Sequence, residues 1–431
     1  MAIRLNSADS GFDKQFSAML GAKREEAEDV NAAVAAILAD VRARGDDAVV
    51  EYTERFDRFS VADLGLSISS DEVSEAVKRC PPEVYDALLF AHERIRAFHD
   101  RQRPDAIQYT DEAGVELGQR WTPVDAAGLY VPGGTAAYPS SVLMNAVPAK
   151  AAGVERLCMV VPTPDGITND QVLAAAAIAG VDEIYRIGGA QAVGALAYGT
   201  DKIAPVAKIV GPGNAYVAAA KRQVFGTVGI DMIAGPSEVL ILADGENSAD
   251  WIAADLLAQA EHDVSAQSIL ITDSQALADD VEAAVEGQLK TLPRAEIAGQ
   301  SWQDNGVIIE VPALREAVSL VDRIAPEHLE ISANIEAELA AAVRNAGAIF
   351  LGPHTPEAVG DYVGGPNHVL PTARSARFSS GLGVLDFMKR TSILRCSADA
   401  LRAIGPAAVT LGRAEGLEAH ARSVALRLNM S

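Results

Sequence analysis

Gln259 and His262 are two side chains whose types and spacing could hold a metal ion. They lie in DWIAADLLAQAEHD (250–263), where Asp255, Gln259 and His262 follow one another at helical spacing and so share one predicted helix face. A glutamine carbonyl and an imidazole three residues apart can bind one cation, because both donate lone pairs to zinc at about 2.0–2.2 Å. A polar helix face without a metal has the same pattern, and both interpretations stay open at this point.

Glu327 and His328 form a second pair, which could transfer protons. In IAPEHLEIS (324–332), Pro326 predicts the first turn of a short helix. Neighbouring side chains on such a turn diverge by about 100° and could flank one pocket. An imidazole with a pKa near about 6.5 is a suitable proton acceptor at neutral pH. The alternative is an exposed Glu-His dipeptide with no chemical role.

Three glycine-rich segments follow predicted strands and could bind phosphate groups. None fits the GxGxxG pattern, because Tyr216 occupies the position of the last glycine in the third segment. Each segment alone is also compatible with a tight turn that enters a helix. Three of them in succession predict an edge that binds phosphate or a nucleotide. The segments are VPGGTAAYPS (131–140), IGGAQAVG (187–194) and VGPGNAY (210–216).

Further candidates lie toward the C-terminus. Asp361 follows Gly360 in a predicted glycine-rich loop, and Glu415 and His420 lie in the last predicted helix, 415–428. This helix has an apolar stripe, which must pack either on its own chain or on a partner subunit. The stripe consists of Leu417, Ala421, Val424 and Leu428.

The remaining histidines are weaker candidates. His92 and His99 lie seven residues apart on a predicted helix and are interpreted as partly buried helix residues without a chemical role. A substrate contact by His354 or His368 is an open question at this stage. His368 is the better candidate, because it lies in the segment that follows Asp361.

Alternating strands and helices must position these side chains. Short apolar runs recur after residue 114 and are separated by alanine-rich helical stretches, which predicts βαβ units, parallel sheets and doubly wound α/β layers. The segment before residue 114 is predicted to be mainly helical, with a capping box at Ser69 and Glu72 and a helix that Pro82 opens. The predicted strands are 127–131, 156–161, 183–187, 207–210, 238–243, 267–272, 306–311 and 348–351.

Charge and cysteine content restrict the classes of partner and the compartment. The formal net charge of −23 disfavours binding to nucleic acid or to an anionic membrane surface. Three widely spaced cysteines exclude a disulfide framework and a CxxC metal site, and they indicate a reducing compartment. The N-terminus has no apolar signal region and no apolar run is long enough to span a bilayer. We therefore expect a soluble cytoplasmic protein.

Several long segments resemble the histidinol dehydrogenase family, and the resemblance runs from about residue 25 to 428. Their common order along the chain makes chance similarity a poor explanation. The most specific segments are IDMIAGPSEVLILAD (230–244), AADLLAQAEHD (253–263), RIAPEHLEI (323–331), GPNHVLPTARSARFSSGLGVLDFMKR (365–390) and EGLEAHARSVALRL (415–428).

The resemblance implies roles for the positions that match the family's motifs, and none of these positions departs from the family pattern. It implies one Zn²⁺ per subunit, NAD as the hydride acceptor and L-histidinol as the substrate. Substrate contacts are implied for Ser237, Glu415, His328 and the zinc ligands. The matching positions are Gln259, His262, Asp361 and His420 for zinc, Glu327 and His328 for catalysis, and Tyr130, Gln191 and Asn214 for NAD.

The resemblance also implies the domain organisation and the assembly. The expected fold is α/β, with two incomplete Rossmann-like doubly wound domains and small helical N- and C-terminal segments. The expected parts are an N-terminal arm (1–24), a main domain (25–129 and 237–381), a second domain that contacts NAD (130–236), and a C-terminal tail (382–431). In a homodimer, this tail would complete the partner's active site.

Three other functions remain possible from the sequence. A related zinc- and NAD-dependent dehydrogenase could act on another small alcohol, such as a sulfonated diol. An aldehyde dehydrogenase that uses a thiol would need a reactive cysteine, and neither Cys158, in a predicted strand, nor Cys396 has a suitable surrounding sequence. A zinc-binding protein without catalytic activity would not need the Glu327–His328 pair together with three nucleotide loops.

Overall fold

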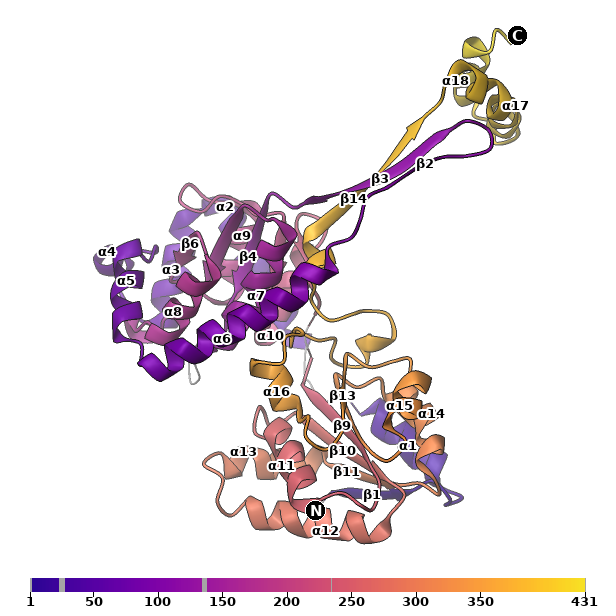
Figure 1. Ribbon diagram of the computed structural model, residues 1–431. Helices are drawn as coiled ribbons and strands as arrows, with labels where there is room; N and C mark the ends of the chain where they lie inside the picture. The colour runs from indigo at the N-terminus through magenta and orange to yellow at the C-terminus, as the bar shows by residue number, and fades with distance from the viewer. Residues whose placement is uncertain (1, 23–27, 134–137, 234, 431) are drawn as a thin grey trace.

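Two parallel sheets and a projecting arm make up the structure, a computed structural model that describes residues 2–22, 28–133, 138–233 and 235–430. The sheets belong to two α/β domains that lie next to each other, and the arm extends from the middle of the molecule to the C-terminus (Figure 1). Among the described residues, no helix combines the length and the apolar character needed to cross a membrane.

The six-stranded sheet has the order β1-β11-β10-β9-β12-β13, and every neighbouring pair is parallel. Counted along the chain from β9, its last five strands have the order 3-2-1-4-5 of a doubly wound fold without its sixth strand. Its strands are β1 (Ile3–Asn6), β9 (Glu238–Ala243), β10 (Gln267–Thr272), β11 (Val307–Glu310), β12 (His328–Ser332) and β13 (Ala348–Leu351).

Helices cover both faces of this sheet. Helices α1 (Phe12–Gly21), α14 (Leu314–Ile324) and α15 (Glu336–Ala342) pack on one face, and α11 (Ala249–Ala260), α12 (Gln275–Gln288) and α13 (Ala295–Asn305) on the other. All six residues of β9 (EVLILA) are buried. This burial on both faces explains why every residue of the strand after Glu238 is apolar. A further helix, α16 (Glu357–Tyr362), follows β13.

The five-stranded sheet has the order β6-β5-β4-β7-β8 and is also parallel. It repeats the 3-2-1-4-5 order, so both domains are incomplete Rossmann-like units, as the sequence predicts. Its strands are β4 (Ala126–Tyr130), β5 (Arg156–Val160), β6 (Glu183–Tyr185), β7 (Lys208–Val210) and β8 (Gly229–Ile230).

Eight helices of this second domain form its two outer layers. One layer consists of α5 (Ser70–Arg79), α6 (Pro82–His99), α7 (Pro139–Ala152) and α8 (Asp170–Ala179), and the other of α2 (Glu28–Arg44), α3 (Asp46–Asp57), α9 (Gly189–Tyr198) and α10 (Ala215–Val224). The short helix α4 (Val61–Leu64) follows α3. The capping box at Ser69 and Glu72 and the start of α6 at Pro82 are confirmed.

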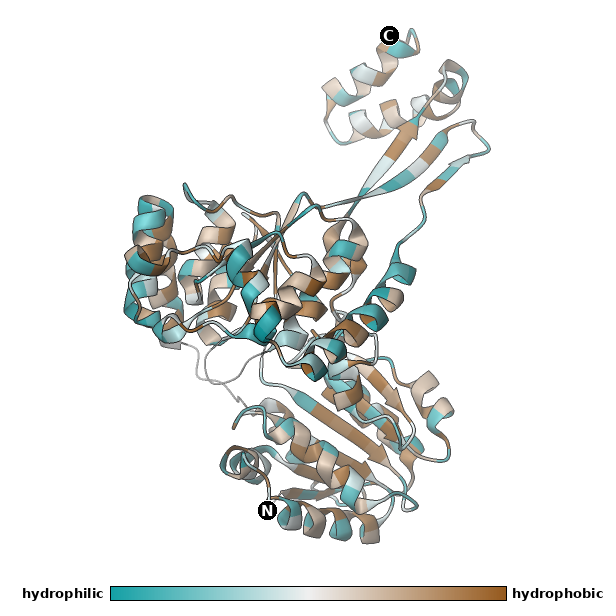
Figure 2. Ribbon diagram, turned by 60° about the vertical axis from the view of Figure 1, so that its left-hand side comes forward, coloured by the Kyte–Doolittle hydropathy of each residue, from teal (hydrophilic) through white to brown (hydrophobic). Residues whose placement is uncertain are grey.

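The division of the chain between the domains differs from the expected one. Helices α2 to α6 and strand β4, expected in the main domain (25–129 with 237–381), pack with the second domain, and β1 of the expected arm (1–24) is an edge strand of the six-stranded sheet. The physical reason is that an apolar helix face shows that it must be buried, but does not show against which sheet. Figure 2 shows the apolar strands enclosed by helices in both domains.

The arm combines an antiparallel sheet with the C-terminal helices. Its strands are β2 (Ile107–Thr110), β3 (Glu116–Pro123) and β14 (Met388–Arg395), in the order β14-β3-β2, and none of them was predicted. Helices α17 (Ala398–Ala414) and α18 (Glu418–Arg427) pack on each other at its end (Figure 1). The arm places the C-terminal helices far from both α/β domains.

Candidate active site

A cavity of about 1250 Å³ between the two α/β domains collects the candidate residues. Every residue predicted for the site outside the C-terminal segment lines it, although these residues come from both domains. They are Tyr130, Gln191, Asn214, Ser237, Gln259, His262, Glu327, His328 and Asp361. His368, which the sequence left open, also lines the cavity, whereas His354 is exposed beside Trp251 outside it.

The two domains face this cavity with opposite edges of their sheets. Tyr130 ends β4, and Asn214 follows β7, so the five-stranded sheet contributes its carboxyl edge, as expected for a doubly wound fold. Ser237 directly precedes β9, and His328 is the first residue of β12, so the six-stranded sheet contributes its amino edge. The predicted helical turn at Pro326 is therefore wrong, because His328 begins a buried strand.

His328 is held in one orientation by the backbone of β9. Its Nδ1 lies 3.0 Å from the carbonyl oxygen of Glu238, and because a carbonyl can only accept, we assign the proton to Nδ1. Nε2 then keeps its lone pair, and among the described residues it is buried without a hydrogen-bond partner. Burial lowers the pKa of His328 to about 4, so the imidazole is neutral near pH 7 and Nε2 can accept a proton.

Glu327 lies beside His328 and is fixed by the same strand. Its Oε2 accepts the backbone N–H of Glu238 at 3.0 Å and lies 3.8 Å from Nδ1 of His328. One backbone residue, Glu238, thus positions both members of the predicted catalytic pair. The sequence carried no signal for this, because any residue type offers the same backbone groups.

Gln259, His262 and Asp361 all line the cavity with side chains that carry metal-donor atoms. Gln259 is fully buried in the last turn of α11, and neither amide atom has a hydrogen-bond partner among the described residues. His262 follows the end of α11, and burial lowers its pKa, which favours the neutral form that binds metals. Burial raises the pKa of Asp361 to about 6, and a cation beside it would offset this penalty.

Asp361 lies in α16 and not in the loop predicted from Gly360. Gly360 is needed inside this helix, because a Cβ atom there would overlap the ring of Phe350. Asp361 Oδ1 lies 3.9 Å from His328 Nε2 and also 3.9 Å from His368 Nδ1. The carboxylate is therefore close to two neutral imidazoles, since burial lowers the pKa of His368 to about 4 as well.

A buried group of carboxyls behind His328 was missed by the sequence analysis. Glu357 Oε2 lies 3.6 Å from His328 Nδ1, and Glu330 Oε1 accepts the backbone N–H of Glu357 at 2.7 Å. Burial raises the pKa of Glu357 well above its usual value, that of Glu330 to about 8 and that of Asp255 to about 6. Asp255 interacts with Glu330 and does not line the cavity. It therefore does not share the cavity with Gln259 and His262, although helical spacing places all three on one face.

Glu415 and His420 lie outside the cavity of their own chain. Glu415 follows α17, and His420 is in α18 at the end of the arm (Figure 1). Within the described part of the chain, no group of three or more histidine, cysteine, aspartate or glutamate side chains is arranged to hold a metal ion. Of the three candidate donors in one chain, His262 and Asp361 are of these types and Gln259 is not, so they do not make a group of three.

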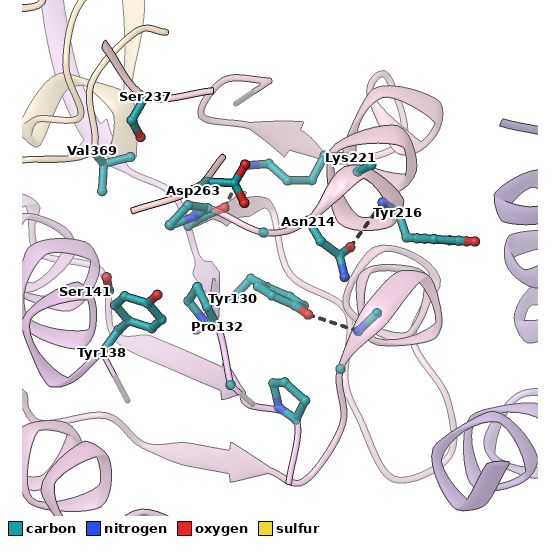
Figure 3. Close-up of a pocket in the computed structure, with 18 of the residues that line it drawn as sticks. Tyr130, Pro132, Tyr138, Ser141, Asn214, Tyr216, Lys221, Ser237, Asp263 and Val369 are labelled. Atoms are coloured by element: carbon teal, nitrogen blue, oxygen red, sulfur yellow. Dashed lines mark hydrogen bonds between the residues drawn. The ribbon is translucent and has the colours of Figure 1, made fainter. Parts of the chain in front are cut away.

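Side-chain hydrogen bonds hold the loops at the carboxyl edge of the five-stranded sheet. The Tyr130 hydroxyl accepts the N–H of Gly189 at 3.0 Å, and the Asn214 side chain caps α10 by accepting the N–H groups of Tyr216 and Val217 (Figure 3). The side-chain oxygen Oε1 of Gln191 is buried and has no hydrogen-bond partner among the described residues. Residues 134–137 of the first glycine-rich segment lie outside the described residues.

Comparison with known proteins gives one consistent result. The family profile described as histidinol dehydrogenase matches residues 21–428. The histidinol dehydrogenase of Rhodospirillum rubrum is 67% identical over 430 residues, covering 100% of this chain and 99% of the relative, and that of Rhizobium meliloti is 66% identical with the same coverage. The crystal structure of histidinol dehydrogenase from Elizabethkingia anophelis is 33% identical, covers 99% of this chain and 98% of its own, and has a TM-score of 0.95.

Proposed function

The chain belongs to the histidinol dehydrogenase family, and we propose that it oxidises L-histidinol to L-histidine through L-histidinaldehyde, with NAD as the hydride acceptor, in the last steps of histidine biosynthesis in the cytoplasm. The observation that carries the proposal is the meeting of Glu327, His328 and the donors Gln259, His262 and Asp361 in one cavity, opposite the nucleotide loops.

Zinc fits the donor set. Gln259, His262 and Asp361 would hold one Zn²⁺ per subunit together with His420 of the partner subunit. The buried amide of Gln259, the neutral imidazole of His262 and the buried carboxyl of Asp361 are the donor types that zinc accepts. When bound, the ion would anchor the imidazole and amine of the substrate and so orient its alcohol carbon toward NAD.

The first oxidation needs a base for the alcohol proton, and we assign this role to His328. The Glu238 carbonyl holds its Nδ1, and its Nε2 has no hydrogen-bond partner in the described part of the chain. Nε2 would take the hydroxyl proton while hydride leaves the carbinol carbon for NAD, and the products would be the aldehyde, NADH and a protonated imidazole. The imidazolium is stabilised by Asp361 and Glu327, which lie within 3.9 Å and 3.8 Å of its two nitrogens.

The second oxidation needs water, and we assign its activation to Glu327. Its carboxylate would accept a proton from water while the water oxygen bonds to the aldehyde carbon, which gives the anion of the aldehyde hydrate. This anion would give a second hydride to a second NAD and so become the carboxylic acid. The backbone N–H of Glu238 keeps this carboxylate beside His328. General base catalysis by a positioned group contributes about 10²–10⁴-fold to such steps.

Tyr130, Gln191 and Asn214 would contact NAD. All three lie at the carboxyl edge of a parallel sheet, and the N-terminus of α10 points at the cavity from there. The positive end of a helix dipole favours a negatively charged group, as a pyrophosphate requires. Ser237, which precedes β9, would contact the substrate from the opposite domain.

We further propose a homodimer in which the C-terminal tail (382–431) completes the site of the partner with Glu415 and His420. The arm exposes large apolar side chains that a second subunit would cover, including Leu394 at 66%, Leu411 at 62% and Leu426 at 66% exposure. This organisation would also explain why the arm places α18, which contains the predicted zinc ligand His420, away from the cavity of its own chain.

The proposed function is tested by mixing the purified protein with NAD and L-histidinol. We expect L-histidine and two NADH per histidinol consumed, because the conversion of an alcohol to a carboxylate removes four electrons. Absorbance reports NADH, and chromatography reports histidine. A sulfonated diol as the competing substrate tests the alternative dehydrogenase, and oxidation of the diol but not of histidinol would contradict the proposal.

Metal removal should separate this chemistry from that of a thiol enzyme. A chelator should abolish NADH formation and added Zn²⁺ should restore it, whereas iodoacetamide should have little effect. Burial raises the pKa of the Cys158 thiol to about 12 and also raises that of Cys80, so neither is a reactive thiolate. Inactivation by iodoacetamide but not by the chelator would instead support a thiol-dependent aldehyde dehydrogenase.

A further inference from the structure

Lys221 and Asp231 form a buried ion pair next to the third glycine-rich segment. Their side chains are only 3% and 1% exposed, and the Lys221 ammonium contacts the Asp231 carboxylate directly. Lys221 comes from α10, and Asp231 directly follows β8. Both line the cavity (Figure 3 shows Lys221), yet neither has a part in the proton and hydride transfers proposed above.

The pair binds both polar groups of one residue, Gly211. Lys221 Nζ donates to the Gly211 carbonyl oxygen at 2.9 Å, and the Gly211 N–H donates to Asp231 Oδ2 at 2.8 Å. The other carboxylate oxygen of Asp231 accepts the N–H of Met232 at 2.6 Å. The pair thus connects the start of the loop 211–214 to the segment that leaves β8.

Gly211 lies where this loop crosses the end of β4. Its φ of +111° is one that residues with a side chain rarely adopt, and a Cβ atom there would overlap the carbonyl oxygen of Tyr130. Gly211 therefore packs directly against the backbone of Tyr130, and Asn214 follows three residues later in the same loop. Since the Tyr130 hydroxyl also accepts the N–H of Gly189, the three loops form one connected unit.

Burying an ion pair at this position costs free energy, which its hydrogen bonds must offset. Two charges lose their hydration on burial, and apolar residues of similar volume are often equally stabilising. Apolar side chains could not, however, hold the N–H and the carbonyl of Gly211 at the same time. Asp231 balances the charge of Lys221, and Asp231 and the Gly211 carbonyl take two of the three N–H donors of its ammonium, so the pair as a whole offers no net charge to a phosphate.

We propose that Lys221 and Asp231 are positioning residues that hold the loop 211–214 in the conformation that binds NAD. The proposal rests on the NAD contacts proposed above for Tyr130 and Asn214. The pair acts through the backbone of Gly211, so its loss should weaken dinucleotide binding more than it slows the chemical step.

The test is the double substitution Lys221→Met with Asp231→Asn, which leaves no buried charge unpaired. We expect the KM for NAD and the dissociation constant of NADH, measured by fluorescence without substrate, to rise about tenfold or more, because small displacements of a binding group have effects of this size. We expect kcat and the KM for histidinol to change less than about threefold. The single substitution Asp231→Asn leaves the buried Lys221 charge unpaired, so it should weaken NADH binding at least as much and also lower the melting temperature.

The matched control is Arg156→Met with Glu183→Gln, which removes an ion pair from the start of β5 and β6, at the opposite edge of the same sheet. It should lower the melting temperature without changing NADH binding. Unchanged NADH affinity in either folded Lys221–Asp231 variant would overturn the inference. Absence of histidinol oxidation by the unsubstituted protein would contradict the proposed function instead, and the NADH titration would still decide the role of the pair.

Discussion

Replacing His328 by glutamine is expected to lower the turnover number about 10²–10⁴-fold while the zinc content stays near that of the unsubstituted protein. Glutamine has a similar reach and can still donate a hydrogen bond to the Glu238 carbonyl, which His328 Nδ1 occupies at 3.0 Å. An amide has no basic lone pair comparable to that of Nε2, so the alcohol proton has no acceptor. The zinc donors Gln259, His262 and Asp361 are unchanged.

The His328 variant should be compared by steady-state kinetics and by metal analysis of the same preparation. His354→Gln is the matched control, because it makes the same chemical change at an exposed histidine outside the cavity. This control should keep full activity. Loss of zinc from the His328→Gln protein would contradict the assigned role, since it would make His328 a determinant of the metal site and not the base.

The parallel sheets could be predicted because their strands are buried on both faces. A strand such as β9, with six buried residues, must be apolar at nearly every position, and this run is visible in the sequence. The start of β12 could not be predicted in the same way. Its residues His328, Glu330 and Ser332 are polar although they are buried. His328 faces the cavity, Glu330 belongs to the buried carboxyls behind it, and Ser332 donates a hydrogen bond to Asn247.

Contacts between distant segments were beyond the reach of sequence patterns. Periodicity shows that α6 has an apolar face, yet the choice of the five-stranded sheet over the six-stranded one depends on the complete fold. The arm was missed for a related reason, since β14 pairs with β3 across more than 260 residues of chain and exposes most of its side chains. The resemblance to a family, and not periodicity, predicted a role for His420 outside its own subunit.

The two sheet edges that line the cavity differ in how clearly the sequence marks them. Glycine-rich loops mark the carboxyl edge of the five-stranded sheet, where helices begin and their N–H groups bind anions. The amino edge of the six-stranded sheet has no such signature, because its site is made of strand starts at Ser237 and His328 and of the end of α11 at Gln259. Substrate and dinucleotide are thus assigned to different domains, and the cavity between them is where hydride transfer would occur.

Mixing two inactive variants is expected to restore activity if His420 serves the partner's site. His262→Asn and His420→Asn should each remove one zinc ligand from both sites of a homodimer and so abolish activity. In a hybrid dimer, one site receives both substitutions and the other receives none. With random pairing, about a quarter of the activity of the unsubstituted protein should return, because half of the dimers are hybrids with one intact site each.

Among residues outside the cavity of their own chain, His420 is expected to have the largest effect on activity, because the arm would place it in the partner's site. The eight residues of β14 alone span roughly 27 Å, and α18 lies beyond them, so His420 does not approach its own Gln259. The matched control pairs His262→Asn with Gln259→Ala, two ligands of the same subunit, because every hybrid of these variants has a defect in both sites and should stay inactive. Activity and zinc content of co-expressed variants report the result. If His420 acted within its own chain, His262→Asn and His420→Asn would behave like this control and no activity would return.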